Sequence, residues 1–159
     1  MPLKVGSELP SLEGATEWFN ATAAAAAEEA KGHPLLVHFW SLGNAPSREG
    51  LLRVAERRER HAAEGLKVIA VHVPTMPDDE DPEAVRDAVT TCRMEEPCAV
   101  DNQYLLRDAF RLEEFDIPAY YLFDASGRLR AFAAGEEGMD AIGPEVERVL
   151  GRGGQTAAG

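Results

Sequence analysis

Two thiols, one imidazole and one polar turn are the groups in this chain whose types and spacing could support chemistry. The cysteines are Cys92 and Cys98. Two thiols exchange a disulfide only when their Cα atoms lie within about 7 Å and their Cβ vectors are suitably aimed, which a sequence does not establish. They are too few for a disulfide scaffold and lack companions at the spacing of a zinc site. We favour small core residues at both positions and keep a redox pair as the alternative.

His38 and the turn from Asn44 to Ser47 are the other candidates. His38 interrupts an apolar run, Leu35–Trp40. A lone histidine there more often satisfies a buried hydrogen bond than catalyses, and the sequence shows no partner acid or nucleophile for it. A pH-dependent role stays open because imidazole titrates near neutrality. Asn44 comes shortly before Pro46, which predicts an ordinary helix N-cap that accepts a hydrogen bond from the first turn.

Composition bounds the possible functions. The chain has 159 residues and is 45% hydrophobic, which predicts a single domain over residues 1–150 and a flexible tail over 151–159. A net charge of -12 argues against nucleic-acid partners, because phosphates are bound by basic surfaces. No apolar run is long enough for a membrane, and Met1 to Pro10 lacks the features of a signal peptide, so we expect a cytoplasmic protein.

Neither a metal nor a cofactor is indicated. The acidic run Asp78–Asp81 could hold a hard cation, but the glycine and terminal glutamate of a calcium loop are missing. A solvated loop that ends in an N-cap is the better interpretation. Asp81 followed by Pro82 is typical of a helix start.

Hydrophobic patterning predicts alternating strands and helices. Strands are expected at Leu35–Trp40, Leu66–Val73, Pro97–Val100, Ala119–Phe123 and Leu129–Ala133. Helices are expected at Ala23–Ala30 with Asn20 as the cap, and at Pro46–Glu64, Pro82–Thr91, Gln103–Leu112 and Asp140–Leu150. This order predicts an α/β fold with a mixed central sheet and helices on both faces.

Several short motifs within this pattern resemble the thioredoxin superfamily. They are the strand end Phe39-Trp40, Ile117-Pro118 before a strand, and Asp124-x-x-Gly127 at the hairpin. The match is closest to the TlpA-like and peroxiredoxin-related branch, on Gly6-x-x-Leu9-Pro10 and on Pro97, Asp101, Asn102 and Tyr104. The peroxidatic cysteine pattern of peroxiredoxins is absent. The resemblance covers roughly residues 5–150.

The resemblance implies a site whose reactive atoms are gone. The two cysteine positions of the family's Cys-x-x-Cys hold Asn44 and Ser47, which cannot exchange disulfides. His38 stands where active members carry a buried acid. Pro118 is expected to be a cis proline facing the Asn44 turn, and the backbone of Ile117 is expected to pair with an extended partner segment.

The prediction is therefore a thioredoxin-like domain that has lost its dithiol and binds a protein or an extended peptide. A homodimer is possible. The expected binding residues are Trp40, Asn44, Ala45, Pro46, Ser47, Ile117 and Pro118. The alternative is a thiol-disulfide oxidoreductase that works through Cys92 and Cys98.

Overall fold

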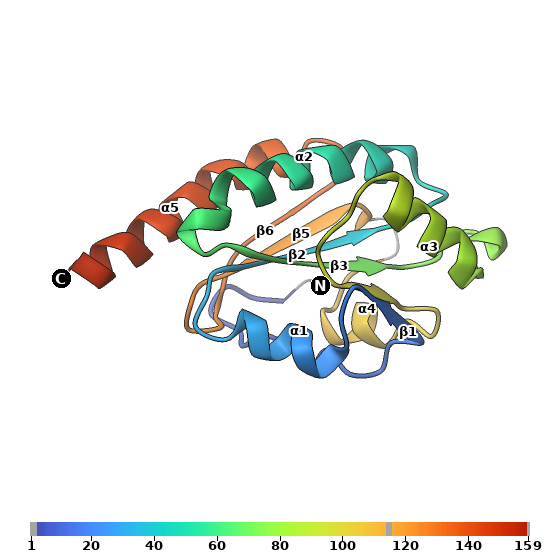
Figure 1. The fold of residues 1–159 in the computed structure, drawn as a ribbon, viewed down its shortest axis with the longest axis horizontal. Coiled ribbons are helices and arrows are strands. Elements are labelled where there is room, and N and C mark those ends of the chain that lie inside the picture. Colours follow the sequence, from blue (N-terminus) through green and yellow to red (C-terminus); the bar gives the residue numbers. More distant parts are fainter. Residues whose placement is uncertain (1–2, 114–115, 159) are drawn as a thin grey trace.

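A computed structural model describes residues 3–113 and 116–158, in which six strands form one sheet in the order β1-β4-β3-β2-β5-β6 (Figure 1). The strands are β1 (Glu17–Phe19), β2 (Leu35–Trp40), β3 (Lys67–His72), β4 (Cys98–Val100), β5 (Ala119–Phe123) and β6 (Leu129–Ala134). The central strands β2, β3 and β4 are parallel, while β1, β5 and β6 run antiparallel to their neighbours. The predicted mixed sheet is confirmed.

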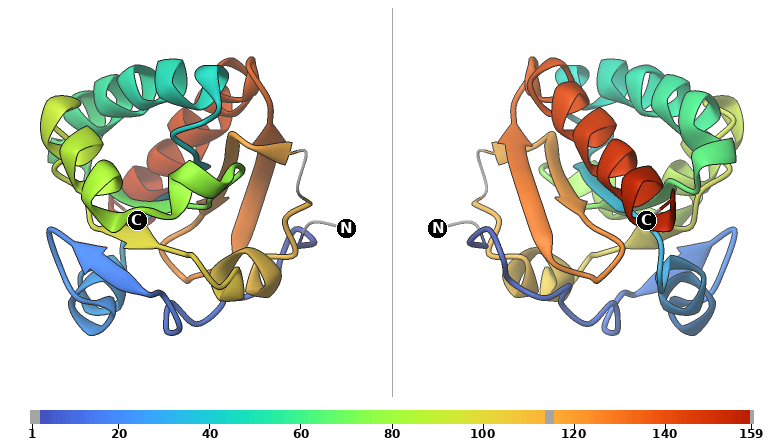
Figure 2. Two further views of the ribbon diagram at one scale, coloured as in Figure 1. Left: turned by 90° about the vertical axis from the view of Figure 1, so that its right-hand side faces the viewer. Right: turned by 90° about the vertical axis from the view of Figure 1, so that its left-hand side faces the viewer.

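Helices cover both faces of this sheet, as predicted. They are α1 (Ala23–Ala30), α2 (Ala45–His61), α3 (Pro82–Thr91), α4 (Leu105–Ala109) and α5 (Gly138–Ala158), with 3-10 turns η1 (Ala62–Glu64) and η2 (Pro77–Glu80). Figures 1 and 2 show α2 and α5 on one side and α1 and α4 on the other. Within the described residues, no helix is apolar and long enough to cross a bilayer.

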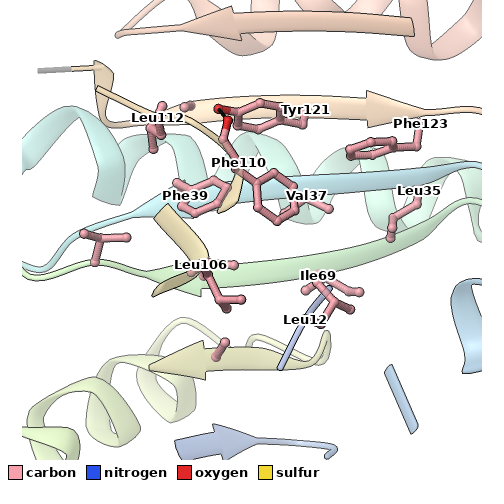
Figure 3. Packing of buried hydrophobic residues seen from close by; sticks show 14 of the residues in the cluster. Leu12, Leu35, Val37, Phe39, Ile69, Leu106, Phe110, Leu112, Tyr121 and Phe123 are labelled. Carbon is pink, nitrogen blue, oxygen red and sulfur yellow. Dashed lines mark hydrogen bonds between the residues drawn. The ribbon is translucent and has the colours of Figure 1, made fainter. Parts of the chain in front are cut away.

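Strand β2 divides the core because its side chains alternate between the two faces. Val37 and Phe39 pack with Phe110 and Tyr121 on the side of α1 and α4, where these aromatic rings meet edge to face (Figure 3). The neighbouring residues of β2 face the other way, toward α2, α3 and α5. His38 therefore lies on the face covered by α2.

Three local predictions need correction. The cap of α1 is Thr22, whose hydroxyl accepts from Ala25 N at 3.1 Å, whereas Asn20 adopts a left-handed φ of 68°. Helix α4 is shorter than predicted because Tyr104 before it has a φ of 61°, which interrupts the helical conformation. Strand β1 was not expected, since three residues carry too little alternation to be seen.

The last helix is longer than its predicted range Asp140–Leu150. Its backbone is helical from Gly138 to Ala158, so residues 151–158 continue the helix, and Gly159 lies outside the described residues. Val146, Val149 and Leu150 of α5 are buried against the sheet. The predicted flexibility of the tail, like the domain boundary at 150, stays a prediction.

Candidate functional site

The turn between β2 and α2 is tied to the loop before β5 by one side chain, that of Asn44. Its Oδ1 accepts a hydrogen bond from Ser47 N at 2.8 Å, so Asn44 is the N-cap of α2 as predicted. Its Nδ2 donates to the carbonyl oxygen of Ile117 at 3.2 Å. The Ile117–Pro118 peptide bond is cis, as the resemblance implied. The structure thus brings together the two segments that we expected to face each other.

Burial separates the seven predicted binding residues into a surface and its support. Ala45 is exposed, and Asn44 and Pro46 are half-buried. Trp40 and Ser47 are each only 1% exposed. The other two, Ile117 and Pro118, are also buried. A partner at this site would meet the first turn of α2, while the remaining residues shape that turn from below.

A buried carboxylate, Asp79, holds the backbone that leads into this turn. Its Oδ2 accepts from Gly43 N at 3.2 Å, Ser41 Oγ at 3.0 Å and Thr75 N at 3.1 Å. It also accepts from Thr75 Oγ1 at 3.1 Å and Met76 N at 3.2 Å. Burial raises the pKa of Asp79, but the hydrogen bonds from Thr75, Ser41 and Gly43 outweigh it, so the pKa lies below its ordinary value. Asp79 therefore locks the loops after β2 and β3 to each other.

The prediction for this acidic segment was a solvated loop followed by an N-cap. Asp81 does cap α3 by accepting from Glu83 N at 3.0 Å. The loop itself is the 3-10 turn η2, and Asp79 within it points inward and is 5% exposed. Among the described residues, no group of three or more potential ligand side chains could hold a metal ion.

His72 at the end of β3 gives a second support to the same turn. Its Nε2 accepts from Leu42 N at 3.1 Å, and its ring meets the ring of Trp40 edge to face at 4.8 Å. Burial lowers the pKa of His72 to about 4. The imidazole is therefore neutral at physiological pH, which is what an acceptor nitrogen at Nε2 requires.

His38 has a partner acid, which the sequence did not reveal. Its Nε2 lies 3.1 Å from Oε2 of Glu96, and both side chains are 2% exposed. The other carboxylate oxygen of Glu96 accepts from Arg58 Nη1 at 2.5 Å. The prediction that His38 satisfies a buried hydrogen bond agrees with this arrangement, but the view of it as a histidine without an acid was wrong.

The charges around Glu96 favour its ionised form. Burial raises the pKa of Glu96, yet the hydrogen bond and charge of His38, together with the charge of Arg58, bring the pKa below its ordinary value of 4.5. Asn20 holds the same loop, since its Nδ2 donates to the carbonyl oxygens of Met94 at 2.9 Å and Glu96 at 3.0 Å. Asn20 is thus a loop anchor rather than a helix cap. His38, Glu96 and Arg58 form a hydrogen-bonded cluster where α2 covers the sheet.

Both cysteines are free thiols, and they differ in burial. Cys92 is the C-cap residue of α3 and is half-buried. Cys98 begins β4 and is 0% exposed. Burial raises the pKa of the Cys98 thiol to about 12. A buried thiol with such a pKa has almost no thiolate at neutral pH, so it is a poor nucleophile.

The order of the strands and helices, with the turn into α2 at the end of β2, is that of a thioredoxin-like fold. A protein named thiol-disulfide oxidoreductase YkuV, from Bacillus subtilis (strain 168), is 36% identical over 149 residues, which are 93% of this chain and 97% of that protein. The solution structure of a thioredoxin-like protein in the oxidized form matches with a TM-score of 0.84 and 36% identity, covering 94% of this chain and 99% of that one.

More distant matches share part of the sequence or the fold. DipZ of Mycobacterium tuberculosis is 28% identical over 143 residues, which are 89% of this chain but 20% of that protein. The thioredoxin-like superfamily protein SPOA0173 shares the fold with a TM-score of 0.76 at 18% identity, covering 92% of this chain and 96% of that one. No family model matches the chain. The chain belongs to the thioredoxin-like thiol-disulfide oxidoreductase family.

Proposed function

We propose that this member of the family does not exchange disulfides and instead binds a protein or an extended peptide at the turn that begins α2. The observation that carries the proposal is the identity and use of the residues there. The side-chain oxygen of Asn44 caps α2, and Ser47 is buried and has no thiol. Neither residue can form or accept a disulfide.

The frame around this turn supports a binding role. Asp79 and His72 hold the loop after β2 in place through hydrogen bonds to Gly43 N and Leu42 N. A preformed loop loses little conformational freedom when a partner binds, which favours affinity. Ala45 is exposed and Pro46 is half-buried, so the centre of this surface carries small apolar side chains.

The alternative, an oxidoreductase that uses Cys92 and Cys98, is disfavoured by the state of Cys98. Its complete burial and raised pKa oppose the thiolate that attack on a disulfide needs. Cys92 alone has no resolving thiol at the protein surface, because the only other cysteine is Cys98.

Insulin reduction by dithiothreitol tests the loss of redox activity. We expect the wild-type protein and the Cys92→Ala/Cys98→Ala variant to give the same background rate. The Asn44→Cys/Ser47→Cys variant is the positive control, because it places two thiols at the start of α2, where helix N-H groups favour a thiolate. Turnover by the wild-type protein that disappears in Cys92→Ala or Cys98→Ala would support the oxidoreductase instead.

Binding is tested with an unfolded chain that cannot undergo thiol exchange. Reduced, carboxamidomethylated ribonuclease A is suitable, since it is unfolded and basic while this protein carries a net charge of -12. We expect saturable binding in fluorescence polarisation at about 0.15 M salt, where distant charges are largely screened. Ala45→Arg should abolish it by placing a bulky cation on the surface.

The matched control for that variant is Ala125→Arg. Ala125 is exposed in the turn between β5 and β6, which lies at the opposite end of the sheet because Phe123 pairs with Leu35 at the start of β2. The control should bind like the wild-type protein. Equal binding by both variants would refute the proposed surface.

A further inference from the structure

The side-chain amide of Asn44 lies where a bound peptide would place its own backbone N-H. In an antiparallel pair, one residue exchanges both an N-H···O and an O···H-N hydrogen bond with its partner. Ile117 is the residue whose backbone faces the α2 turn, and its carbonyl oxygen accepts from Asn44 Nδ2 at 3.2 Å. The carbonyl oxygen of the pairing position is therefore already bonded to a side chain of the protein itself.

The two hydrogen bonds of Asn44 have separate purposes. The bond from Ser47 N to Oδ1 caps α2, and any short oxygen-bearing side chain could accept it. The bond from Nδ2 to Ile117 adds nothing to the cap, and only a side chain with a donor at that reach can make it. The second bond joins a helix start to a loop that is far away in the sequence.

We propose that Asn44 is a built-in competitor of the partner's backbone, so that a peptide pairs with Ile117 only by displacing the Asn44 amide. This inference rests on the proposed function and adds the requirement for exchange. When the site is empty, the Asn44 amide satisfies a carbonyl that is next to buried Ile117 and Pro118 side chains. When the site is filled, a partner N-H replaces the amide at that oxygen. Partners that cannot offer an N-H there, such as a segment with proline at that place, are rejected.

Two substitutions separate the competitor role from the capping role. Asn44→Ser keeps a good N-cap but is too short and loses the amide. Asn44→Asp also keeps the cap and has no donor. Because a typical hydrogen bond contributes a net free energy of about 1 kcal/mol, we expect both variants to bind the unfolded ribonuclease A probe about twofold to tenfold more tightly than the wild-type protein. Circular dichroism and thermal unfolding check that each variant keeps its fold, because a partly unfolded protein exposes apolar surface that also binds unfolded chains.

Asn102→Ser is the matched control. It removes an amide-to-carbonyl hydrogen bond of the same kind, from Asn102 Nδ2 to Glu80 O at 2.8 Å, in another loop. We expect this variant to bind the probe with the wild-type affinity. If it binds as tightly as Asn44→Ser, the gain does not come from the Ile117 carbonyl and the inference is wrong.

A second measurement follows the amide itself. In ¹⁵N-labelled wild-type protein, one side-chain amide proton of Asn44 should exchange slowly with water when the site is empty. At saturation with the probe, that protection should be lost, because Nδ2 is then displaced. Retained protection in the complex would overturn the inference.

The outcomes distinguish the inference from the function beneath it. Equal affinity of the wild-type protein and Asn44→Ser would refute the competitor and leave the proposed function standing, with the carbonyl accepting two donors at once. Absence of binding by both proteins would refute the proposed function, and the inference with it.

Discussion

Replacing Glu96 by glutamine tests whether the buried charge cluster is as important as its geometry indicates. Glu96→Gln removes the carboxylate that lies between His38 and Arg58, where the side chain is 2% exposed. Arg58, with its side chain 13% exposed, would keep its charge without the close partner. Breaking one side of a buried pair costs about 3–5 kcal/mol. Because the glutamine oxygen can still accept one hydrogen bond, we expect a loss near the lower end, about 3 kcal/mol.

Urea unfolding followed by circular dichroism measures this loss. With a slope of about 2 kcal/mol per molar urea, a loss of 3 kcal/mol lowers the midpoint by about 1.5 M. The control is Glu95→Gln at the adjacent position. Glu95 has a side chain that is 82% exposed and lies 4.0 Å from Arg58 Nε, so its loss should change the free energy of unfolding by less than about 1 kcal/mol. Equal midpoints for the two variants would refute the reasoning.

The effect of Glu96→Gln on the free energy of unfolding should depend on pH in a direction that the structure predicts. The pKa of Glu96 is lowered in the folded protein, so its contribution to stability is fully present above the ordinary pKa of 4.5 that it has in the unfolded chain. The contribution is lost as the pH falls through the lower, folded-state pKa. The difference in unfolding free energy between the wild-type protein and Glu96→Gln should therefore be constant near pH 7 and shrink below about pH 4. A difference that grows on acidification would contradict the assigned direction.

Three further substitutions or labels test other parts of the structure. Asp79→Ala should lower the free energy of unfolding by about 2–4 kcal/mol, because several donors lose a charged acceptor. The control Asp78→Ala removes an exposed side chain and should change the free energy of unfolding little. Thermal unfolding compares the two variants, and similar melting temperatures would count against the role of Asp79. Gly50→Ala should be destabilised by about 1 kcal/mol, because the new Cβ would collide with the Tyr120 hydroxyl and this strain exceeds the gain in helix propensity. Thermal unfolding of the double variant Gly50→Ala/Tyr120→Phe should show recovered stability. No recovery would show that another contact is responsible. The thiol of Cys98, with its pKa raised to about 12, should not react with a disulfide reagent at pH 8 until the protein is unfolded. Titration should find one reactive thiol in the native protein and two in urea. Two reactive thiols in the native protein would contradict the buried position of Cys98.

The parts of the fold that the sequence predicted are those with strong local signals. The apolar run Leu35–Trp40 and the pair Asp81-Pro82 identified β2 and the start of α3 without help from distant residues. The range of α1 was predicted correctly but its cap was not, because Asn20 and Thr22 are both good caps and only the tertiary contacts of Asn20 decide between them. Strand β1 depends on its pairing with β4, which no local pattern encodes.

The same distinction applies to the site. The cap at Asn44 was predictable, because its acceptor role uses the next turn of chain. Its bond to Ile117 was not, because that carbonyl is brought near only by the sheet. Glu96 was missed as the partner of His38 for the same reason, since the two are far apart in the sequence. The one available signal was the polarity of His38 itself, since a buried imidazole requires a partner.

The pairing of the N-terminal segment has a consequence for the order in which the chain acquires structure during synthesis. Strand β1 is held by β4, and the backbone before it, from Gly6 to Leu9, is bonded to residues of the late β5–β6 hairpin, through Gly127 and Leu129. When the first helix leaves the ribosome, the strands that pair with the segment before it have not yet been made. Contacts of such long sequence separation form late, because the intervening loop must first be closed. Residues 6–9 are therefore ordered only after the β5–β6 hairpin has been made.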